Sequence, residues 1–338
     1  MLNSMYSGIS GLGANQKKLD VIGNNVANSG TTSFKSSSVT FQDSMYQSYK
    51  GASGPGLNLG GVNPSRVGMG VSVQSIVTNM AQGSLQPTGR PYDVAIDGTG
   101  YFIVAKGPES GTITVDADQS MSSTNLESFY TRDGSFKVDT SGNLLNSNGY
   151  RIMGYQITDA TGISPDDKGV VNYVDGESPA LDAIQNKLVP LKIPEVVMKD
   201  GKEVRIQGFS IENDGLIKAV LADGSTTVLG QVAMASFTNN EGLEQKGNNL
   251  YSPSANSGNP LARVGKYSSE AKLDSYGGNR TDNGKAYGQV LNGFLEMSNV
   301  DLSAQFTDMI VATRSFQACG KIITTADEIL QELVNLKR

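Results

Sequence analysis

Aspartates followed by glycine are the residues whose type and spacing come nearest to a catalytic pattern in this sequence. Six Asp-Gly pairs occur between residues 71 and 253, at 97–98, 133–134, 175–176, 200–201, 214–215 and 223–224. Two carboxylates held at a fixed separation can act as general acid and general base, as in glycoside hydrolysis. Nothing in the sequence pairs these aspartates at a defined distance, and Asp-Gly is favoured in tight type I′ hairpin turns. We therefore interpret them as turn formers.

Other kinds of catalytic and metal site lack their usual residues. The chain has 338 residues, with no histidine, no tryptophan and one cysteine. Without histidine there is no imidazole to activate a serine or cysteine, or to bind zinc. Cys319 cannot form a disulfide within the chain and is expected to be a small buried side chain on a helix. We predict that the chain is not an enzyme and has no catalytic, cofactor-binding or metal-binding residues.

Charge and hydropathy exclude two further classes of partner. The formal net charge is −6 and no run of basic residues occurs, which argues against nucleic-acid binding. No apolar stretch is long enough to span a bilayer, so we expect no membrane insertion. Residues 1–18 lack the pattern of a cleaved secretory signal. The chain is therefore expected to stay in the cytoplasm or to leave the cell by a route without a cleaved peptide.

The N-terminal segment, from residue 2 to about 27, has apolar residues at alternating intervals of three and four. This spacing is typical of a coiled-coil seam. Four glycines interrupt the segment, and each costs about 1 kcal/mol relative to alanine inside a helix. The helix is therefore expected to need a partner, and the glycines would let a neighbouring backbone approach closely. The predicted seam positions are Leu2, Met5, Ile9, Leu12, Leu19 and Val26.

The C-terminal segment shows the same spacing over a longer distance. A capping signal at residues 298–301 predicts a helix from about residue 300 almost to Arg338. Its predicted seam positions are Leu302, Phe306, Met309, Phe316, Ile323, Leu330 and Val334. A second apolar stripe carries Ile310, Ile322, Ile329, Leu333 and Leu336. One stripe can meet the N-terminal helix, and the second is expected to face neighbouring copies of the chain.

The segments between the ends predict an α+β fold with a discontinuous inner domain. Residues 1–30 and 300–338 form paired, coiled-coil-like helices, and residues 71–253 form an antiparallel β-rich outer domain with a possible small extension at 155–190. The Gly/Ser-rich stretches 31–70 and 254–299 are expected to be extended connectors. The glycines expected to make the first connector flexible are Gly51, Gly54, Gly56, Gly60 and Gly61. Within the β domain, hairpins are expected at 94–104 and 129–138, followed by a turn at 139–143.

Several motifs in this chain resemble the axial proteins of the bacterial flagellum, and the hook protein (FlgE-like) in particular. The N-terminal motifs are MYSGISGL at 5–12, LDVIGNNVAN at 19–28 and SFKS at 33–36. Further motifs are QGSL at 82–85, DVAIDGTGYF at 93–102, YTRDGSF at 130–136 and NGYR at 148–151. Two more follow at the C-terminal end, EMSNVDLS at 296–303 and LVNLK at 333–337.

The resemblance implies a structural subunit that polymerises into the curved tube of the flagellar hook. Such a subunit is exported unfolded by the flagellar type III apparatus, without a cleaved signal, and is found outside the cell in the hook and basal body. The tube acts as a universal joint that transmits motor torque from rod to filament. The implied partners are further copies of the chain, the hook cap, the distal rod, the hook–filament junction proteins and the export apparatus.

Two alternatives remain open from the sequence. The distal rod protein of the same flagellum shares the terminal motifs and the first β motifs, and a straight, stiff polymer would favour it. The longer chain and the residues at both ends of the last helix favour the hook. From a different class, a surface adhesin with a β-rich binding domain would bind a glycan and would keep that function without its helical ends.

Overall fold

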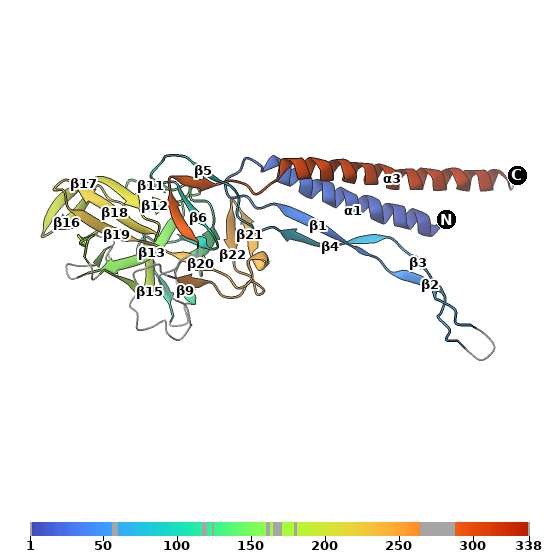
Figure 1. The fold of residues 1–338 in the computed structure, drawn as a ribbon, viewed down its shortest axis with the longest axis horizontal. Helices are drawn as coiled ribbons and strands as arrows, with labels where there is room; N and C mark the ends of the chain where they lie inside the picture. Colours follow the sequence, from blue (N-terminus) through green and yellow to red (C-terminus); the bar gives the residue numbers. More distant parts are fainter. Residues whose placement is uncertain are drawn as a thin grey trace. The chain divides into compact units, whose positions relative to one another are not determined.

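The computed structural model describes residues 2–55, 60–116, 120–123, 125–159, 163–164, 171–178, 181–263 and 288–336. The fold is α+β, with a helix at each end of the chain and an antiparallel β-rich region between them (Figure 1). The chain divides into two compact units. Unit 1 comprises Met1–Gly30, Lys35–Met80 and Asn299–Arg338, and unit 2 comprises Thr31–Phe34 and Ala81–Ser298.

Unit 1 is built from two long helices and a β-hairpin. The helices run antiparallel, because residues near the start of the first helix contact the second half of the last one. The last helix has 34 residues and is therefore about 51 Å long. The elements of unit 1 are α1 (Leu2–Ala27), β1 (Ser37–Asp43), β2 (Tyr46–Lys50), β3 (Ser65–Gly68), β4 (Val71–Thr78) and α3 (Leu302–Asn335).

The ends of both helices follow local capping chemistry. The Asp301 side chain accepts hydrogen bonds from the main-chain N–H groups of Ser303 and Ala304, as expected for a helix N-cap. At the end of α1, the Asn28 side chain donates to the carbonyl oxygen of Asn24 at 2.9 Å. Gly30 does not have a positive φ, so the helix does not end on a left-handed glycine at this position.

Residues 37–78 form one long hairpin within unit 1. Strand β1 pairs with β4 and β2 pairs with β3, all antiparallel, and an isolated bridge joins Ser53 to Val62 near the tip. Much of the expected connector over 31–70 is therefore paired strand, and β4 belongs to unit 1 rather than to the β domain. Backbone pairing along a hairpin needs no apolar core, which is why the polar Gly/Ser composition did not reveal it.

The expected flexible glycines lie at the tip of this hairpin and not between the two units. Gly51, Gly54, Gly60 and Gly61 follow β2 or precede β3, and Gly56 lies outside the described residues.

Unit 2 holds the remaining strands, and all pairings between its named strands in the described residues are antiparallel. Its first strands are β5 (Leu85–Pro87), β6 (Val94–Asp97), β7 (Tyr101–Lys106), β8 (Ile113–Val115), β9 (Met121–Ser123), β10 (Glu127–Thr131), β11 (Lys137–Val138) and β12 (Leu144–Leu145). The next are β13 (Arg151–Thr158), β14 (Ile163–Ser164), β15 (Asp182–Pro190), β16 (Val196–Lys199), β17 (Lys202–Ile211), β18 (Leu216–Leu221) and β19 (Thr226–Val232). The last elements are β20 (Met234–Ser236), the short helix η1 (Asn240–Gly242), β21 (Glu244–Gly247), β22 (Leu250–Ser252), β23 (Leu261–Arg263), β24 (Gln289–Asn292) and β25 (Phe294–Glu296).

Strand β13 organises the core of unit 2, because it pairs with β7 at one end and with β15 and β19 at the other. At Gly154 a side chain would collide with the carbonyl oxygen of Gln231 and with Leu191, so only glycine allows this close packing. The rings of Phe102 and Phe136 meet edge to face, with centroids 5.1 Å apart. Both rings are fully buried, and the apolar core is continuous around them.

Both expected β-hairpins are wrong, and the expected turn is confirmed. Strand β6 pairs with β24 and not with β7, and β10 pairs with β7 and β22 and not with β11. Residues 139–143 do form the turn between β11 and β12. Asp200 and Gly201 both have positive φ between β16 and β17, as a type I′ turn requires. The errors arose because a local turn signal does not specify pairing between distant strands.

The stretch from 254 to 299 also differs from an extended connector. Strands β24 and β25 pair with β6 and β5 inside unit 2, while residues 264–287 lie outside the described residues. The extension expected at 155–190 also belongs to unit 2. Most of its described residues lie in strands β13, β14 and β15.

Candidate assembly surface

The contact between α1 and α3 is made by small side chains. A Cβ placed on Gly11 would lie 2.8 Å from the Sγ of Cys319, and one on Gly8 would lie 3.2 Å from Cγ1 of Ile323. Ala14 and Ala312 are also buried. The two backbones therefore approach closely over this part of the pair, as the glycines had suggested.

The other half of the helix pair is held by polar groups. Lys18 Nζ donates to Asp308 Oδ1 at 2.9 Å. Further along, the buried Asn25 side chain donates to the carbonyl oxygen of Ser37 at 2.8 Å and to Gln305 Oε1 at 3.0 Å. Its own Oδ1 accepts the N–H of Ser37 at 3.0 Å. Asn25 thus joins α1 to the start of β1 and to α3 through both N–H groups and the oxygen of its side-chain amide.

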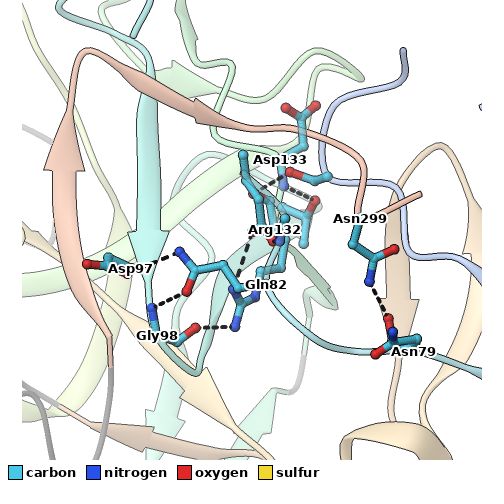
Figure 2. A network of polar contacts seen from close by, with 11 residues as sticks. Asn79, Gln82, Asp97, Gly98, Arg132, Asp133 and Asn299 are labelled. Atoms are coloured by element: carbon cyan, nitrogen blue, oxygen red, sulfur yellow. Dashed lines mark hydrogen bonds and ion pairs between the residues drawn. The ribbon is translucent and has the colours of Figure 1, made fainter. Parts of the chain in front are cut away.

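Two further contacts fix the hairpin within unit 1. The Asn299 side chain donates to the carbonyl oxygen of Asn79 at 2.8 Å (Figure 2) and accepts the N–H of Ser36 at 2.7 Å. Gly70 has a φ of 121°, and a side chain there would collide with Ser10 of α1. The hairpin therefore lies directly against α1 at this point.

The predicted seam residues divide between the two faces of the helix pair. Half-buried side chains are Met5, Leu12, Leu19, Val26, Met309, Ile323 and Leu330. Exposed side chains are Ile9, Leu302, Phe306, Phe316 and Val334. The side chain of Leu2 lies outside the described residues. Of these positions, Ile323 faces Gly8 of the partner helix.

The second predicted stripe lies on the outside of unit 1. Ile310 is 62% exposed, and the other members of the stripe, which are also exposed, are Ile322, Ile329, Leu333 and Leu336. Together with Phe306, which is 50% exposed, they leave α3 with a long apolar surface. Isolated apolar side chains are normal on a protein surface, but this many exposed apolar side chains on one helix are typical of an interface.

Sequence reasoning missed a second exposed apolar group, on the β2–β3 hairpin. We define it as the hairpin patch, which consists of Met45, Tyr46, Tyr49, Val67 and Met69. The side-chain hydrogen bond with Asp43 raises the pKa of Tyr46. Two tyrosines within four residues, beside Met45, were the available signal.

The described residues show no sign of other kinds of site. Within them, no group of three or more Cys, Asp or Glu side chains is arranged to hold a metal ion. No helix in the same residues is both long and apolar enough to cross a bilayer. Unit 2 contains buried tyrosines, and burial raises the pKa of Tyr101 and of Tyr130 to about 12. These tyrosines pack around Phe237 as core residues.

Three segments of the chain match models of one protein family. Residues 5–35 match the flagella basal body rod protein family, and residues 95–219 match the flagellar hook protein FlgE/F/G D1 domain. Residues 291–336 match the C-terminal region of the flagellar basal body rod FlgEFG proteins.

Individual relatives match over the whole chain. The flagellar basal-body rod protein FlgG of Bacillus subtilis is 40% identical over 338 residues, with complete coverage of both chains. The flagellar hook protein FlgE of Borreliella burgdorferi is 29% identical over an alignment of 476 residues, also with complete coverage of both. The FlgG protein of the same organism is 27% identical over 341 residues, again with both chains covered completely.

Among solved structures, the hook protein FlgE2 of Helicobacter pylori matches with a TM-score of 0.39 and 10% identity, over 63% of this chain and all of that one. The full-length sequence relationship, with family matches at both ends and in the middle, establishes that this chain belongs to the family of structural flagellar rod and hook proteins.

Proposed function

We propose that this chain is the distal rod subunit of a bacterial flagellum, which polymerises into a straight tube. The observation that carries this proposal is its 40% identity over 338 residues to the rod protein FlgG of Bacillus subtilis, without a large insertion in either chain. The sequence alone had favoured the hook. The alignments favour the rod.

Chain length supports the same assignment, contrary to the expectation drawn from the sequence. Matches to proteins named FlgG extend over 338 to 341 residues, whereas those to hook proteins extend over 453 to 498. The hook proteins therefore contain sequence for which this chain of 338 residues has no counterpart. One β-rich unit between the helices accounts for the length of this chain.

The exposed apolar surfaces support polymerisation. The outer face of α3 and the hairpin patch both present side chains that would lose contact with water if further copies packed against them. Burial of apolar area contributes about 25 cal/mol per Å², so several such contacts per subunit can hold a tube together. We propose that Ile310, Ile322 and Ile329 contact neighbouring copies in this way.

Location and partners follow from the same proposal. The subunit would be exported without a cleaved signal by the flagellar type III apparatus and would be placed in the basal body outside the cytoplasmic membrane. Its partners would be further copies of itself and the adjoining hook.

The hook remains the second candidate, because hook proteins also match over the whole chain at 27 to 29% identity. In that case the tube would be curved and flexible. The two functions differ in the shape of the polymer, which can be observed directly.

Electron microscopy of polymer grown from the purified full-length chain tests the proposal. A straight, stiff tube is expected for a rod subunit, whereas a curved tube would assign the chain to the hook. A companion experiment introduces the chain into Borreliella burgdorferi lacking either FlgG or FlgE, to which it is similarly related. Restored assembly in the FlgG-deficient strain alone is the expected result, with each strain complemented by its own gene as the control.

A further inference from the structure

A buried ion pair lies at the point in unit 2 where separate segments of the chain meet. Arg132 follows β10 and Glu296 ends β25, and their side chains are 5% and 0% exposed. Arg132 Nη1 donates to Glu296 Oε2 at 3.2 Å. Arg132 Nη2 donates to the carbonyl oxygen of Gly98 at 2.6 Å (Figure 2). The guanidinium group also lies 5.5 Å from the centre of the Tyr101 ring, on its face.

The backbone of the same two residues holds the short segment Thr31–Phe34. The N–H of Ser33 donates to the carbonyl oxygen of Glu296 at 2.8 Å. Its hydroxyl donates to the carbonyl oxygen of Arg132, also at 2.8 Å. Ser33 has a φ of 56°, which is unusual for a residue other than glycine. These contacts hold Ser33 in a strained conformation that a loosely attached segment would not keep.

The other carboxylate oxygen of Glu296 binds a third segment, which contains Gln82 and Gly83. Its Oε1 accepts the N–H of Gly83 at 2.9 Å. The neighbouring Gln82 accepts the N–H of Gly98 at 3.0 Å and donates to Asp97 Oδ1 at 3.1 Å (Figure 2). Gly83 must be glycine, because a side chain there would collide with the carbonyl oxygen of Met297.

Each of these segments lies close in sequence to a point where the chain passes from one unit to the other. The chain passes between the units after residues 30, 34, 80 and 298. Ser33, Gln82, Gly83 and Glu296 all belong to unit 2, and each lies within three residues of one of those passages. We propose that the Arg132–Glu296 pair is a clamp that fixes the places where the chain leaves unit 2, so that the segments continuing into unit 1 start from rigid ends.

The proposal differs from a simple gain in stability, because a buried ion pair is often no more stabilising than apolar residues of similar size. Replacing both partners with Met and Leu would keep the volume filled while removing the hydrogen bonds to Gly83 and Gly98. The clamp would then be lost although the β core stays folded. The proposal concerns the single subunit and holds for a rod or a hook protein.

Amide hydrogen exchange of the full-length chain tests this inference, on the double variant Arg132→Met/Glu296→Leu and on the single variant Glu296→Gln. The probes are the amides of Ser33, Gly83 and Gly98, compared with the core amide of Leu191, which donates to Ile152. The expected result for the double variant is exchange at least tenfold faster at the three probes, with no change at Leu191. The matched control is Lys199→Met, which removes the ion pair with Asp223 at the surface of the same unit.

Each outcome bears on the proposal. Faster exchange confined to the three probes supports a clamp. Equal acceleration at the probes and at Leu191 would show that the pair only stabilises unit 2, and unchanged probes would show that it holds nothing; either result overturns the inference. If Glu296→Gln fails to fold because Arg132 is left buried without its partner, the double variant alone decides.

Discussion

Units 1 and 2 place their large apolar side chains in opposite positions. In unit 2 the bulky residues are inside, as with the fully buried Phe102 and Tyr155. In unit 1 the buried positions of the helix pair are mostly small residues such as Gly11 and Ala312, with Ile22 as a large exception. Phe306 and other large side chains of α3 are outside. Unit 2 therefore obtains its stability within one chain. Unit 1 leaves much of its apolar surface available for other copies.

Two phenylalanines provide the strongest test of this difference. Phe102→Ala should lower the free energy of unfolding of the subunit by about 3–5 kcal/mol, because it leaves a cavity in a closed core. Phe306→Ala should change that free energy by less than about 0.5 kcal/mol, because its ring is half exposed already. Urea unfolding followed by circular dichroism measures both values.

The same pair should behave in the opposite way in assembly. Under conditions where the Phe102→Ala subunit is still folded, it should polymerise like the natural chain, whereas Phe306→Ala should raise the concentration needed for polymerisation. Sedimentation of polymer measures that concentration. Equal assembly by Phe306→Ala and the natural chain would contradict an assembly role for this face.

A smaller effect is expected at the polar half of the helix pair. Asn25→Ala removes three hydrogen bonds from a buried site and leaves the partner groups on Ser37 and Gln305 unsatisfied, at a cost of about 1–3 kcal/mol. Gln16→Ala, on an exposed part of α1, is the control and should have little effect. Thermal unfolding of the helical signal distinguishes them, and equal melting temperatures would show that Asn25 does not join the three elements.

Replacing glycines in α1 should give effects of about 1 kcal/mol that depend on their surroundings. Gly13→Ala should stabilise the helix by about that amount, because nothing lies near its Cβ position. Gly11→Ala should lose this gain, because the new methyl group meets Cys319 Sγ. Adding Cys319→Ala should restore it. Equal stabilisation by both single variants would mean that the helices are not packed closely at Gly11.

A further effect depends on pH and is confined to unit 2. Burial raises the pKa of Tyr101 from 10.0 to about 12, so the folded state holds its proton more tightly than the unfolded chain does. The resulting stability is fully present below pH 10 and is lost as the pH rises toward 12. Tyr101→Phe should therefore make the decline in unfolding free energy over this range less steep. Urea midpoints measured between pH 9 and 12 provide the comparison, and identical slopes would contradict it.

The helices could be predicted from the sequence because their spacing persists over many turns. The end of α1 at Ala27 and the cap at Asp301 agree with the expected positions. The face by which the helices meet was harder to recognise, because hydropathy patterns emphasise large residues whereas this contact uses small ones. The seven-residue spacing of Ala312, Cys319 and Ala326 was the signal that could have identified it.

The arrangement of the strands could not be predicted with the same success. Asp-Gly turns are local, but β6 pairs with β24, almost two hundred residues away in the sequence. Pairing at such distances depends on how the whole core packs. The clamp was missed for the same reason, since Arg132 and Glu296 are separated by 164 residues and neither belongs to a charge pattern.

The hydrogen bond from Ser33 to Glu296 has a consequence for the order of folding. Lys18 and Asp308 are 290 residues apart, and closing so long a loop carries a large entropy cost. Once unit 2 has formed, Ser33 and Glu296 are already in contact, so only the short stretches beyond them remain to be ordered. This lowers the closure cost by about 2 kcal/mol. The β unit would thus act as an intramolecular template on which the two ends of the chain find each other.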